Sequence, residues 1–400
     1  MNYHQCLRYL EKREKFGIKL GLANIKRLLK KIGSPEKNLR IIHVAGTNGK
    51  GSVCAMISSM LFEAGYKVGM YTSPHLVSIN ERFKINGKNI SNRDFAKYLS
   101  MTVQSVDTQT YFEITTAMAF LYFKEQNIDF AVIEVGMGGR LDSTNVAIPI
   151  ISIITNIALE HTQYLGVTIR KIAYEKAGII KNNIPVVTGA KGDALKVIKS
   201  IAEKRNSPLL AVKKFEVPPL GLQGKFQMKN AAIAVAAINV LKGRGNLKIS
   251  KAEIKNGLNK TKWDGRMQFI GKNLLLDCAH NPDGMAAFAK EAKLLKKRFN
   301  RLIIIIGIMK DKDIGEMANE ICNFADKIII TKVKGDRAAE PKWIAKFFKK
   351  HGREFEIKKN VYGAFWYSKS IAGKNDLIVV TGSCYLIGEF LSKGRLKVKF

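Results

Sequence analysis

The stretch HVAGTNGKGSV at residues 43–53 combines a lysine and a serine with closely spaced glycines. Backbone N–H groups at the start of a helix attract phosphate, and glycines let the chain curl so that several such groups converge on one anion. The common phosphate-loop pattern is G-x-x-x-x-G-K-[ST]. Here Val44 stands where its first glycine belongs, and Gly51 separates Lys50 from Ser52. We therefore predict a variant phosphate loop, with a glycine-rich packing turn as the alternative.

A carboxylate and an imidazole follow two later apolar runs. Glu134 comes directly after the apolar residues 130–133, and His161 lies shortly after the run 150–155. Open α/β sheets bind ligands at the carboxyl ends of their strands. With the Ser52 hydroxyl near the phosphates, these side chains indicate a magnesium site. The structural alternatives are a glutamate that only stabilises a strand end and a hydrogen-bonded core histidine.

The elements that must position these residues follow an alternating pattern. From about residue 40, β-branched runs alternate with amphipathic stretches, which is typical of a parallel α/β fold. Strands are predicted over Arg40–Ala45, Val68–Thr72, Phe130–Val135, Ile150–Thr155, Ile184–Val187, Asn273–Asp277, Leu302–Ile306, Lys327–Thr331 and Leu377–Thr381. Helices are predicted over Ser52–Glu63, Arg93–Val106, Glu113–Glu125, Ile169–Ala177 and Lys229–Leu241.

The polar stretch NKTKWDG at residues 259–265 separates two such series of elements. A chain of 400 residues is also too long for one ordinary core. We predict two α/β domains. Residues 1–262 form a P-loop-type ATPase domain with a mainly parallel sheet, and residues 263–400 form a smaller Rossmann-like domain.

Composition limits the class of protein. Hydrophobic residues make up 46% of the chain and charged residues 25%, as in ordinary globular proteins. The longest apolar stretch, residues 147–159, is too short to span a membrane, and the charged N-terminus has no signal-peptide core. The 5 scattered cysteines contain no C-x-x-C pair, which argues against a thiolate metal site and for a reducing compartment. We expect a cytoplasmic protein without a membrane partner.

The net charge of +34 raises the alternative of a basic, ATP-dependent nucleic-acid-binding protein. The lysines and arginines are spread along the whole chain, and no zinc-finger or helix-turn-helix spacing is present. Anionic small molecules explain the charge equally well. We therefore expect no nucleic-acid partner.

The loop AGTNGKGS resembles the ATP loop of the Mur ligase superfamily and, within it, of the dihydrofolate synthase/folylpolyglutamate synthase family. The resemblance covers nearly the whole chain. It departs from the family pattern at Cys278, where glycine or alanine is usual, and at Glu160, where aspartate is usual. Its further landmarks are KLGL (19–22), YTSPHL (71–76), ERFKING (81–87), TYFE (110–113), EVGMGGRLDSTN (134–145), EHTQYLG (160–166), EKAGIIK (175–181), GRMQ (265–268) and DCAHNP (277–282).

The resemblance implies roles for particular residues. Metal binding falls to Ser73, Glu134 and His161. Catalytic roles fall to Lys50, Lys176 and His280, with Lys176 carbamylated so that it binds a second magnesium. The implied nucleotide-binding residues are Asn48, Gly49, Lys50, Gly51, Ser52, Asn230, Arg266 and Asp277.

The residues alone leave other interpretations open. Lys176 is otherwise a surface lysine of its helix, and Arg266 a surface charge on a linker. Asp277 is otherwise a helix cap before Pro282. Asn230 is expected to begin an alanine-rich helix.

Three segments match the family's dihydropteroate-binding regions. Leu20, Tyr111 and Phe112 would line an apolar slot for the pterin, unless the two aromatic residues only anchor the core at a helix start. The implied acceptor-binding residues are Lys19, Leu20, Gly21, Leu22, Thr110, Tyr111, Phe112, Glu113, Leu141, Asp142 and Ser143.

The resemblance implies an ATP-dependent ligase that adds L-glutamate to dihydropteroate, to the γ-carboxylate of a folate, or to both, through an acyl phosphate. Its cofactors would be ATP and Mg²⁺ at two sites, and its partners would be these small molecules alone. A monomer is the family default. The rival is another amino-acid ligase of the superfamily, for whose UDP-binding domain the residues before the loop leave little room.

Overall fold

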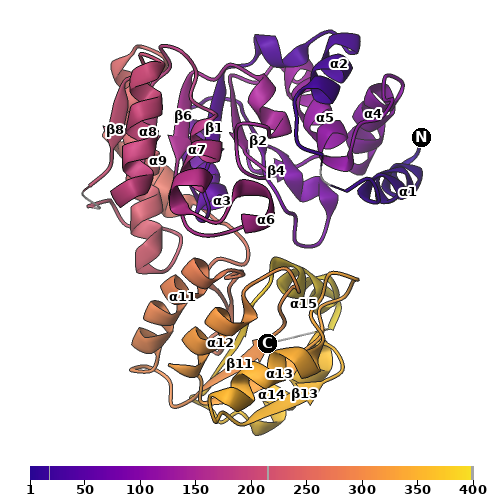
Figure 1. Cartoon of the computed structure of the whole chain (residues 1–400), viewed down its shortest axis with the longest axis vertical. Coiled ribbons are helices and arrows are strands. Elements are labelled where there is room, and N and C mark those ends of the chain that lie inside the picture. The colour runs from indigo at the N-terminus through magenta and orange to yellow at the C-terminus, as the bar shows by residue number, and fades with distance from the viewer. Residues whose placement is uncertain (18, 214–215, 398–400) are drawn as a thin grey trace. The chain divides into compact units, whose positions relative to one another are not determined.

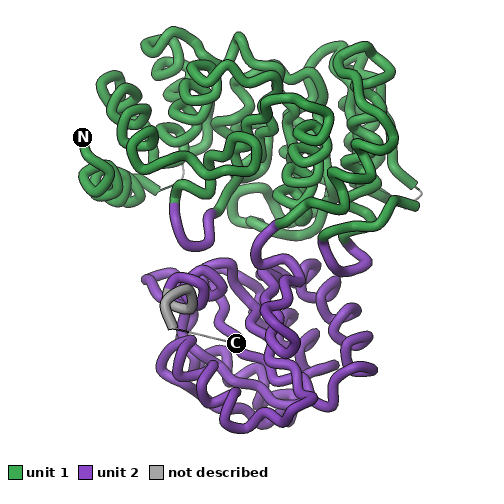
Figure 2. The backbone as a smooth tube through the Cα atoms, turned by 180° about the vertical axis from the view of Figure 1, so that it is seen from behind, with its two compact units in different colours: residues 1–74, 79–221, 227–262 green, residues 75–78, 222–226, 263–400 purple. Residues whose placement is uncertain are grey.

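The computed structural model describes residues 1–17, 19–213 and 216–397, with backbone alone from residue 393. The chain divides into two compact units, which Figure 2 colours separately. Unit 1 comprises residues 1–74, 79–221 and 227–262, and unit 2 comprises residues 75–78, 222–226 and 263–400. Residues 75–78 and 222–226 thus belong to unit 2, although they lie within the sequence of unit 1. The predicted single boundary after residue 262 does not include these two segments.

Unit 1 is built on an eight-stranded sheet in the order β4-β3-β2-β5-β1-β6-β7-β8, with helices on both faces (Figure 1). From β2 onward in this order every pair is parallel, whereas β3 pairs antiparallel with β2 and β4. The strands are β1 (Ile41–Ala45), β2 (Val68–Tyr71), β3 (Phe83–Ile85), β4 (Lys88–Asn89), β5 (Phe130–Glu134), β6 (Ile151–Ile154), β7 (Val186–Thr188) and β8 (Leu209–Ala211). Every residue of β1 and β5 is buried, as expected of central parallel strands.

The helices around this sheet begin with local signals in the sequence. Reciprocal capping boxes start α1, α5 and α10, formed by Asn2 with Gln5, Thr110 with Glu113, and Ser250 with Glu253. The helices are α1 (Tyr3–Glu14), α2 (Ala23–Lys31), α3 (Lys50–Glu63), α4 (Asn92–Val103), α5 (Tyr111–Glu125), α6 (Thr162–Leu165), α7 (Ile169–Ala177), α8 (Gly192–Lys204), α9 (Lys225–Gly243) and α10 (Lys251–Lys260). Short 3-10 turns are η1 (Pro35–Asn38), η2 (Ile79–Arg82) and η3 (Ser143–Val146).

Unit 2 has its own six-stranded sheet in the order β13-β12-β11-β14-β10-β9, in which only β9 is antiparallel to its neighbour. The strands are β9 (Gln268–Ile270), β10 (Leu274–Leu276), β11 (Leu302–Ile306), β12 (Lys327–Thr331), β13 (Phe355–Lys358) and β14 (Leu377–Thr381). The helices are α11 (Pro282–Leu295), α12 (Ile314–Cys322), α13 (Pro341–Lys350), α14 (Val361–Ile371) and α15 (Cys384–Lys397).

The predicted fold class is confirmed, because each unit is an α/β structure on a mainly parallel sheet. All the strands predicted from β-branched runs are present, with ends that differ by at most two residues. The strands that sequence reasoning missed are short or lie at an edge of a sheet: β3, β4, β8, β9 and β13. Their patterns are weak because edge strands bury few residues.

Within the described part of the chain, no helix has the length and apolar character needed to cross a membrane.

The helix that follows the glycine-rich loop, α3, is fixed by close packing on α10. A Cβ atom added at Gly257 of α10 would lie 2.5 Å from the Cα and 2.7 Å from the N of Met60. The Oγ of Ser59 also donates a hydrogen bond to the carbonyl of Gly257 at 2.7 Å. Two helix backbones that meet this closely leave no room for a side chain, so Gly257 determines the position of α3.

We expect Gly257→Ala to lower the free energy of unfolding by about 2 kcal/mol, because an overpacked contact between backbones outweighs the higher helix propensity of alanine. The matched control is Gly243→Ala, at the end of α9, where a Cβ atom would meet nothing within 4 Å. Urea-induced unfolding measures both variants. Equal stability of Gly257→Ala and Gly243→Ala would contradict the packing account.

Candidate active site

The order of strands in unit 1 brings the separate sequence motifs to one edge of the sheet. β1 lies between β5 and β6, and the three strands are parallel. Their carboxyl ends therefore open on the same side. β1 leads into the glycine-rich loop, β5 ends at Glu134, and β6 is followed by Thr155.

Polar residues after β6 hold the glycine-rich loop in place. The N–H of Asn48 donates to Oδ1 of Asn156 at 2.7 Å, and Oγ1 of Thr155 donates to the carbonyl of Asn48 at 2.6 Å. The N–H of Thr47 donates to the carbonyl of Asn156 at 2.9 Å. Gly46 has a φ of +148°, and a Cβ atom there would lie 1.8 Å from Oγ1 of Thr155. Close approach to Thr155 therefore requires glycine at the start of the loop.

The loop runs directly into α3. Gly49 adopts a left-handed φ of +82° at the N-cap, and the helix begins at Lys50, two residues before the predicted start. The first N–H groups of a helix have no partner within it, so Lys50, Gly51 and Ser52 present their amides at a helix N-terminus. The Nζ of Lys50 donates to the carbonyl of Thr47 at 3.2 Å. This geometry suits a bound phosphate, because the first amides of α3 lie where the glycine-rich loop ends.

Asn230 lies against this loop, although the prediction that it begins a helix is wrong. α9 begins at Lys225, so Asn230 lies in its second turn. The first turn carries no N-cap residue that would have marked the helix start in the sequence. A Cβ atom at Gly49 would lie 2.3 Å from Oδ1 of Asn230. The Nδ2 of Asn230 donates to Oε1 of the buried Gln227 at 2.8 Å. Gln227 thus orients the Asn230 amide, a role that sequence reasoning missed.

Lys176 is buried in the last turn of α7, which excludes a surface lysine. Its Nζ donates to the carbonyl of Gly46 at 2.7 Å. Burial, followed by the positive charge of Lys50, lowers the pKa of Lys176 to about 7 against the opposing charges of Glu160 and Asp142. A lysine with this pKa is largely a neutral amine at pH 8, unlike an ordinary lysine with a pKa of about 10.4.

A clasp between the loop after β5 and the end of α7 positions Lys176. The guanidinium of Arg140 donates to both carboxylate oxygens of Glu175, with its shortest contact at 2.8 Å, and the N–H of Arg140 donates to the carbonyl of Glu175 at 2.7 Å. The Nδ2 of Asn145 donates to the carbonyls of Arg140 and Gly178 at 3.0 and 3.1 Å. Lys176 follows Glu175, so these bonds fix the turn that carries it.

Of the three predicted metal ligands, the structure shows a direct contact between Ser73 and Glu134. Oε2 of the buried Glu134 accepts a hydrogen bond from the N–H of Ser73 at 3.1 Å, which joins the ends of β5 and β2. His161 precedes α6 with a left-handed φ of 51°. Across the described residues, no three His, Cys, Asp or Glu side chains form a metal-holding group. Magnesium commonly takes one or two carboxylates and completes its shell with phosphate oxygens and water, which suits Glu134 beside a phosphate loop.

The predicted acceptor segment at residues 19–22 precedes α2. Lys19 and Leu20 are exposed, Leu20 by 44%, and Gly21 has a φ of +139°. Leu22 is the N-cap residue of α2 and packs against the core of unit 1. Only the first two side chains of this segment are therefore largely free of the core.

Thr110 and Glu113 have a structural role that sequence reasoning missed. Oε2 of the buried Glu113 accepts hydrogen bonds from N and Oγ1 of Thr110 at 2.8 and 3.0 Å, which completes the capping box of α5. Between them, Phe112 packs on Tyr71 with ring centroids 6.1 Å apart, and the guanidinium of Arg82 lies 5.2 Å from the Tyr111 ring centroid. Both aromatic rings are half-buried, so they anchor the core and keep part of their surface.

In the third predicted acceptor segment, Asp142 is buried and caps η3. Its carboxylate accepts hydrogen bonds from the N–H of Met137 at 2.9 Å and from N and Oγ1 of Thr144 at 3.0 and 2.5 Å. Burial raises the pKa of Asp142 in spite of these bonds. Leu141 is half-buried and Ser143 is buried.

In unit 2 the predicted residues gather after β10. The carboxylate of Asp277 accepts hydrogen bonds from the N–H groups of Met267 and Ala279, both at 2.9 Å. Burial raises the pKa of Asp277 to about 6, although Arg266 lowers it. The helix cap before Pro282 is Asn281, whose Oδ1 accepts from the N–H of Gly284 at 2.8 Å, so the cap interpretation of Asp277 is excluded.

Arg266 and His280 both point to one carbonyl in this loop. Nη1 of Arg266 and Nδ1 of His280 lie 3.4 and 2.8 Å from the carbonyl oxygen of Cys278. Arg266 is half-buried, which differs from a free surface charge on a linker. The Cys278 carbonyl therefore brings the Arg266 guanidinium, which precedes β9, beside the loop that carries Asp277 and His280.

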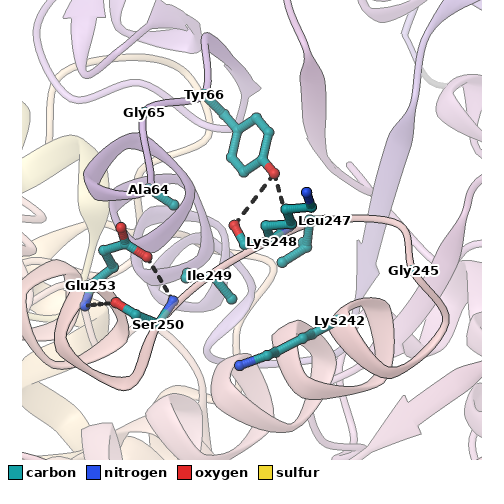
Figure 3. A pocket seen from close by; sticks show the side chains of 10 residues that line it. All are labelled: Ala64, Gly65, Tyr66, Lys242, Gly245, Leu247, Lys248, Ile249, Ser250 and Glu253. Atoms are coloured by element: carbon teal, nitrogen blue, oxygen red, sulfur yellow. Dashed lines mark hydrogen bonds between the residues drawn. The ribbon is translucent and has the colours of Figure 1, made fainter.

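A hollow of about 720 Å³ lies at the opposite end of α3 from the glycine-rich loop (Figure 3). The hydroxyl of Tyr66 bonds to both N and the carbonyl of Lys248, and Ser250 and Glu253 form the capping box of α10. None of the predicted site residues lines this hollow.

Comparison with known proteins shows the family of the chain. Residues 44–216 match the Mur ligase middle domain, and residues 265–384 match the Mur ligase glutamate ligase domain. The chain is 35% identical, over an alignment 433 residues long, to the dihydrofolate synthase/folylpolyglutamate synthase of Bacillus subtilis (strain 168), covering 99% of both proteins. It is 33% identical over 427 residues to the folylpolyglutamate synthase of Lacticaseibacillus casei, covering 96% of this chain and 97% of that protein.

Solved structures show the same fold. E. coli FolC in complex with DHPP and ADP has a TM-score of 0.88 and 28% sequence identity, covering 96% of both chains. The bifunctional folylpolyglutamate synthase/dihydrofolate synthase of Yersinia pestis, complexed with AMPPNP and a Mn ion, also has a TM-score of 0.88, at 27% identity, covering 99% of this chain and 98% of that one. The chain is therefore an ATP-dependent ligase that belongs to the dihydrofolate synthase/folylpolyglutamate synthase family of Mur ligases.

Proposed function

We propose that this ligase joins the amine of L-glutamate to the carboxylate of dihydropteroate and to the γ-carboxylate of folates, with ATP converted to ADP and phosphate. The observation that supports this most directly is the phosphate loop with the buried Lys176 on its Gly46 carbonyl and Glu134 at the neighbouring strand end. The B. subtilis relative carries both activities in its name, and the E. coli structure holds DHPP with ADP.

The phosphate loop would bind the nucleotide through backbone amides. The amides of residues 49–52 would face the β- and γ-phosphates, with Lys50 as a point charge. Asn230, oriented by Gln227, would complete the wall beside Gly49. From unit 2, Asp277 would accept hydrogen bonds from the ribose hydroxyls, and Arg266 would contact the phosphates.

Ser73, Glu134 and His161 would hold one magnesium, and a carbamate on Lys176 would hold a second. Bound magnesium supplies charge neutralisation at the transferred phosphoryl group. Lys176 is suited to carbamylation because a neutral amine is the form that reacts with carbon dioxide, and its pKa is lowered to about 7. The Arg140–Glu175 clasp would keep this group facing the loop.

A carboxylate is a poor electrophile, so the acceptor must be activated before the amine attacks. The acceptor carboxylate takes the γ-phosphoryl group of ATP, which gives an acyl phosphate and ADP. Lys50 and the helix N-terminus offset the charge that develops on the phosphoryl oxygens. The glutamate amine then attacks the carbonyl carbon, and the tetrahedral intermediate expels phosphate. We assign His280 to this half of the reaction, where an imidazole can accept the proton of the amine.

Leu20 and the half-buried faces of Tyr111 and Phe112 would supply the apolar surface for the pterin. Lys19, Gly21, Leu22 and the segment 141–143 would surround it. Thr110 and Glu113 would act through the capping box, since their polar atoms are engaged there. The chain is proposed to work on small anionic substrates, which suits its net charge of +34.

Gly49→Ala tests the phosphate loop. The side chain would displace the Asn230 amide, so we expect ADP affinity to fall at least about tenfold by calorimetry, a loss near 1.4 kcal/mol. Gly33→Ala is the matched control, because Gly33 has the same φ of +82° but nothing within 4 Å of its Cβ position. Both variants should lose similar stability from backbone strain. Unchanged ADP affinity in Gly49→Ala would rule out this loop as the nucleotide site.

ADP release with magnesium, ATP and L-glutamate tests the acceptor range. We expect turnover with dihydropteroate and with tetrahydrofolate, and none without an acceptor. Turnover with tetrahydrofolate alone would refute the dihydropteroate half of the proposal. Turnover with neither, at normal ADP affinity, would refute the folate assignment.

Matched variants connect this assay to the acceptor segment. Leu20→Ser should raise KM for dihydropteroate about tenfold, because a buried leucine contact is worth roughly 1–2 kcal/mol. Leu210→Ser is the control, since Leu210 is 43% exposed against 44% for Leu20 and lies in the edge strand β8. Equal KM values in the two variants would contradict a role for Leu20.

A further inference from the structure

Two free cysteines of unit 2 lie side by side after adjacent strands. Cys278 follows β10 and Cys384 follows β14, and these strands are parallel neighbours. The Sγ of Cys384 lies 4.0 Å from the carbonyl oxygen of Cys278. Both side chains belong to the same core cluster, where Cys278 is 1% and Cys384 7% exposed.

The surroundings activate one thiol of the pair. Hydrogen bonds from Cys278 and from His280, together with the charge of Arg266, hold the pKa of Cys384 well below its usual range, although burial opposes the shift. Cys384 is also the first residue of α15, where the N-terminal amides of a helix favour a thiolate. The pKa of Cys278 is raised well above its usual range, first by its hydrogen bond with Cys384 and then by burial.

The other thiols have the opposite environment. Burial raises the pKa of Cys6, Cys54 and Cys322, and these residues lie in unit 1 or, for Cys322, in α12 against a different core cluster of unit 2. Cys322 is half-buried and so more exposed than either member of the pair. Exposure alone would therefore make Cys322 the first thiol to react, whereas activation selects Cys384.

We propose that Cys278 and Cys384 form a reversible disulfide, made by a hydroperoxide, that lowers the affinity of the enzyme for nucleotide. The pair is a modification site with an attacking thiol, Cys384, and a resolving thiol, Cys278. The effect on nucleotide rests on the proposed role of Asp277 in ATP binding, whereas the disulfide itself does not.

The chemistry balances with hydrogen peroxide as the oxidant. The Cys384 thiolate attacks one peroxide oxygen, the O–O bond breaks, and hydroxide leaves as Cys384 becomes a sulfenic acid. The sulfur of Cys278 then attacks this sulfenic sulfur, the S–O bond breaks, and the proton of Cys278 leaves with the oxygen as water. In sum, two thiols and one peroxide give one disulfide and two waters.

A bond between these sulfurs would disturb the loop that carries the predicted nucleotide ligands. The sulfurs must approach to about 2 Å, which pulls Cys278 toward the start of α15. Asp277 precedes Cys278, and both Arg266 and His280 contact the Cys278 carbonyl. Movement of this residue therefore shifts the Asp277 carboxylate and breaks the contacts of Arg266 and His280 with the Cys278 carbonyl.

The test uses the full-length chain with one equivalent of hydrogen peroxide, followed by intact mass, peptide mapping and ADP calorimetry. We expect a loss of about 2 Da, a peptide that links Cys278 to Cys384, and an ADP affinity lowered at least about tenfold. Dithiothreitol should restore both mass and affinity. Oxidation first at Cys322, or no crosslink between Cys278 and Cys384, would overturn the proposal.

Three variants sharpen the result. Cys278→Ala should bind ADP normally when reduced and should stop at a sulfenic acid on Cys384, which dimedone labels. Cys384→Ala should not oxidise at Cys278, and Cys322→Ala should behave as the wild type.

A crosslink between Cys278 and Cys384 that leaves ADP affinity unchanged would refute the effect of the disulfide on nucleotide binding. Reduced wild-type protein without ADP affinity would instead contradict the proposed function, while the mass measurement would still decide whether the disulfide forms.

Discussion

The hydrogen bond from the buried amine of Lys176 to the carbonyl of Gly46 is the contact on which the rest of the site depends. It joins the end of α7 to the first glycine of the phosphate loop across 2.7 Å. Gly46 must approach Thr155 closely, so the loop, the segment after β6 and α7 are fixed as one arrangement. An amine enclosed in this way keeps its proton poorly, because burial disfavours the charged form.

This arrangement follows from the order of the strands. Because β1 lies between β5 and β6, the loop, Glu134 and Thr155 meet at one edge, although they are far apart in sequence. In unit 2 the parallel neighbours β10 and β14 likewise end at the same edge of their sheet, and this places Asp277 and Cys278 beside Cys384. In each unit burial moves the pKa of an ionisable group near a strand end: Lys176, from α7, contacts the residue after β1 and has its pKa lowered to about 7, and Asp277 follows β10 and has its pKa raised to about 6.

Much of this fold can be predicted from sequence, because strong β-branched runs such as residues 302–306 form central, fully buried strands. Edge strands such as β4 and β8 bury little and leave a weak pattern. The start of α9 was misplaced because its first turns carry no capping signal. The alternatives for Lys176 and Asp277 could be decided only by burial, which depends on packing between distant elements.

The contacts that position the site are harder to predict than the residues in the motifs. Arg140 and Glu175 are 35 positions apart, and nothing local marks either as the partner of the other. Gln227 likewise acts only through Asn230. Asn156 could have been found, since it follows a predicted strand that ends beside the loop. Thr110 and Glu113 have a capping-box spacing, which identifies a helix start from sequence alone. Because both residues also belong to a family motif, they were assigned to substrate binding and their capping role was missed.

The proposed carbamylation of Lys176 is tested most directly by ¹³C NMR of the protein in ¹³C-bicarbonate. A neutral amine reacts and an ammonium does not, so the carbamate signal should grow as the pH rises through about 7. The signal should be absent in Lys176→Met and should persist in the control variant Lys181→Arg. Burial and the charge of Arg205 lower the pKa of Lys181 to about 8, but its Nζ donates to the carbonyl of Asn145 and not to the glycine-rich loop. A carbamate signal that survives Lys176→Met, or no signal in the wild type across this pH range, would contradict the account.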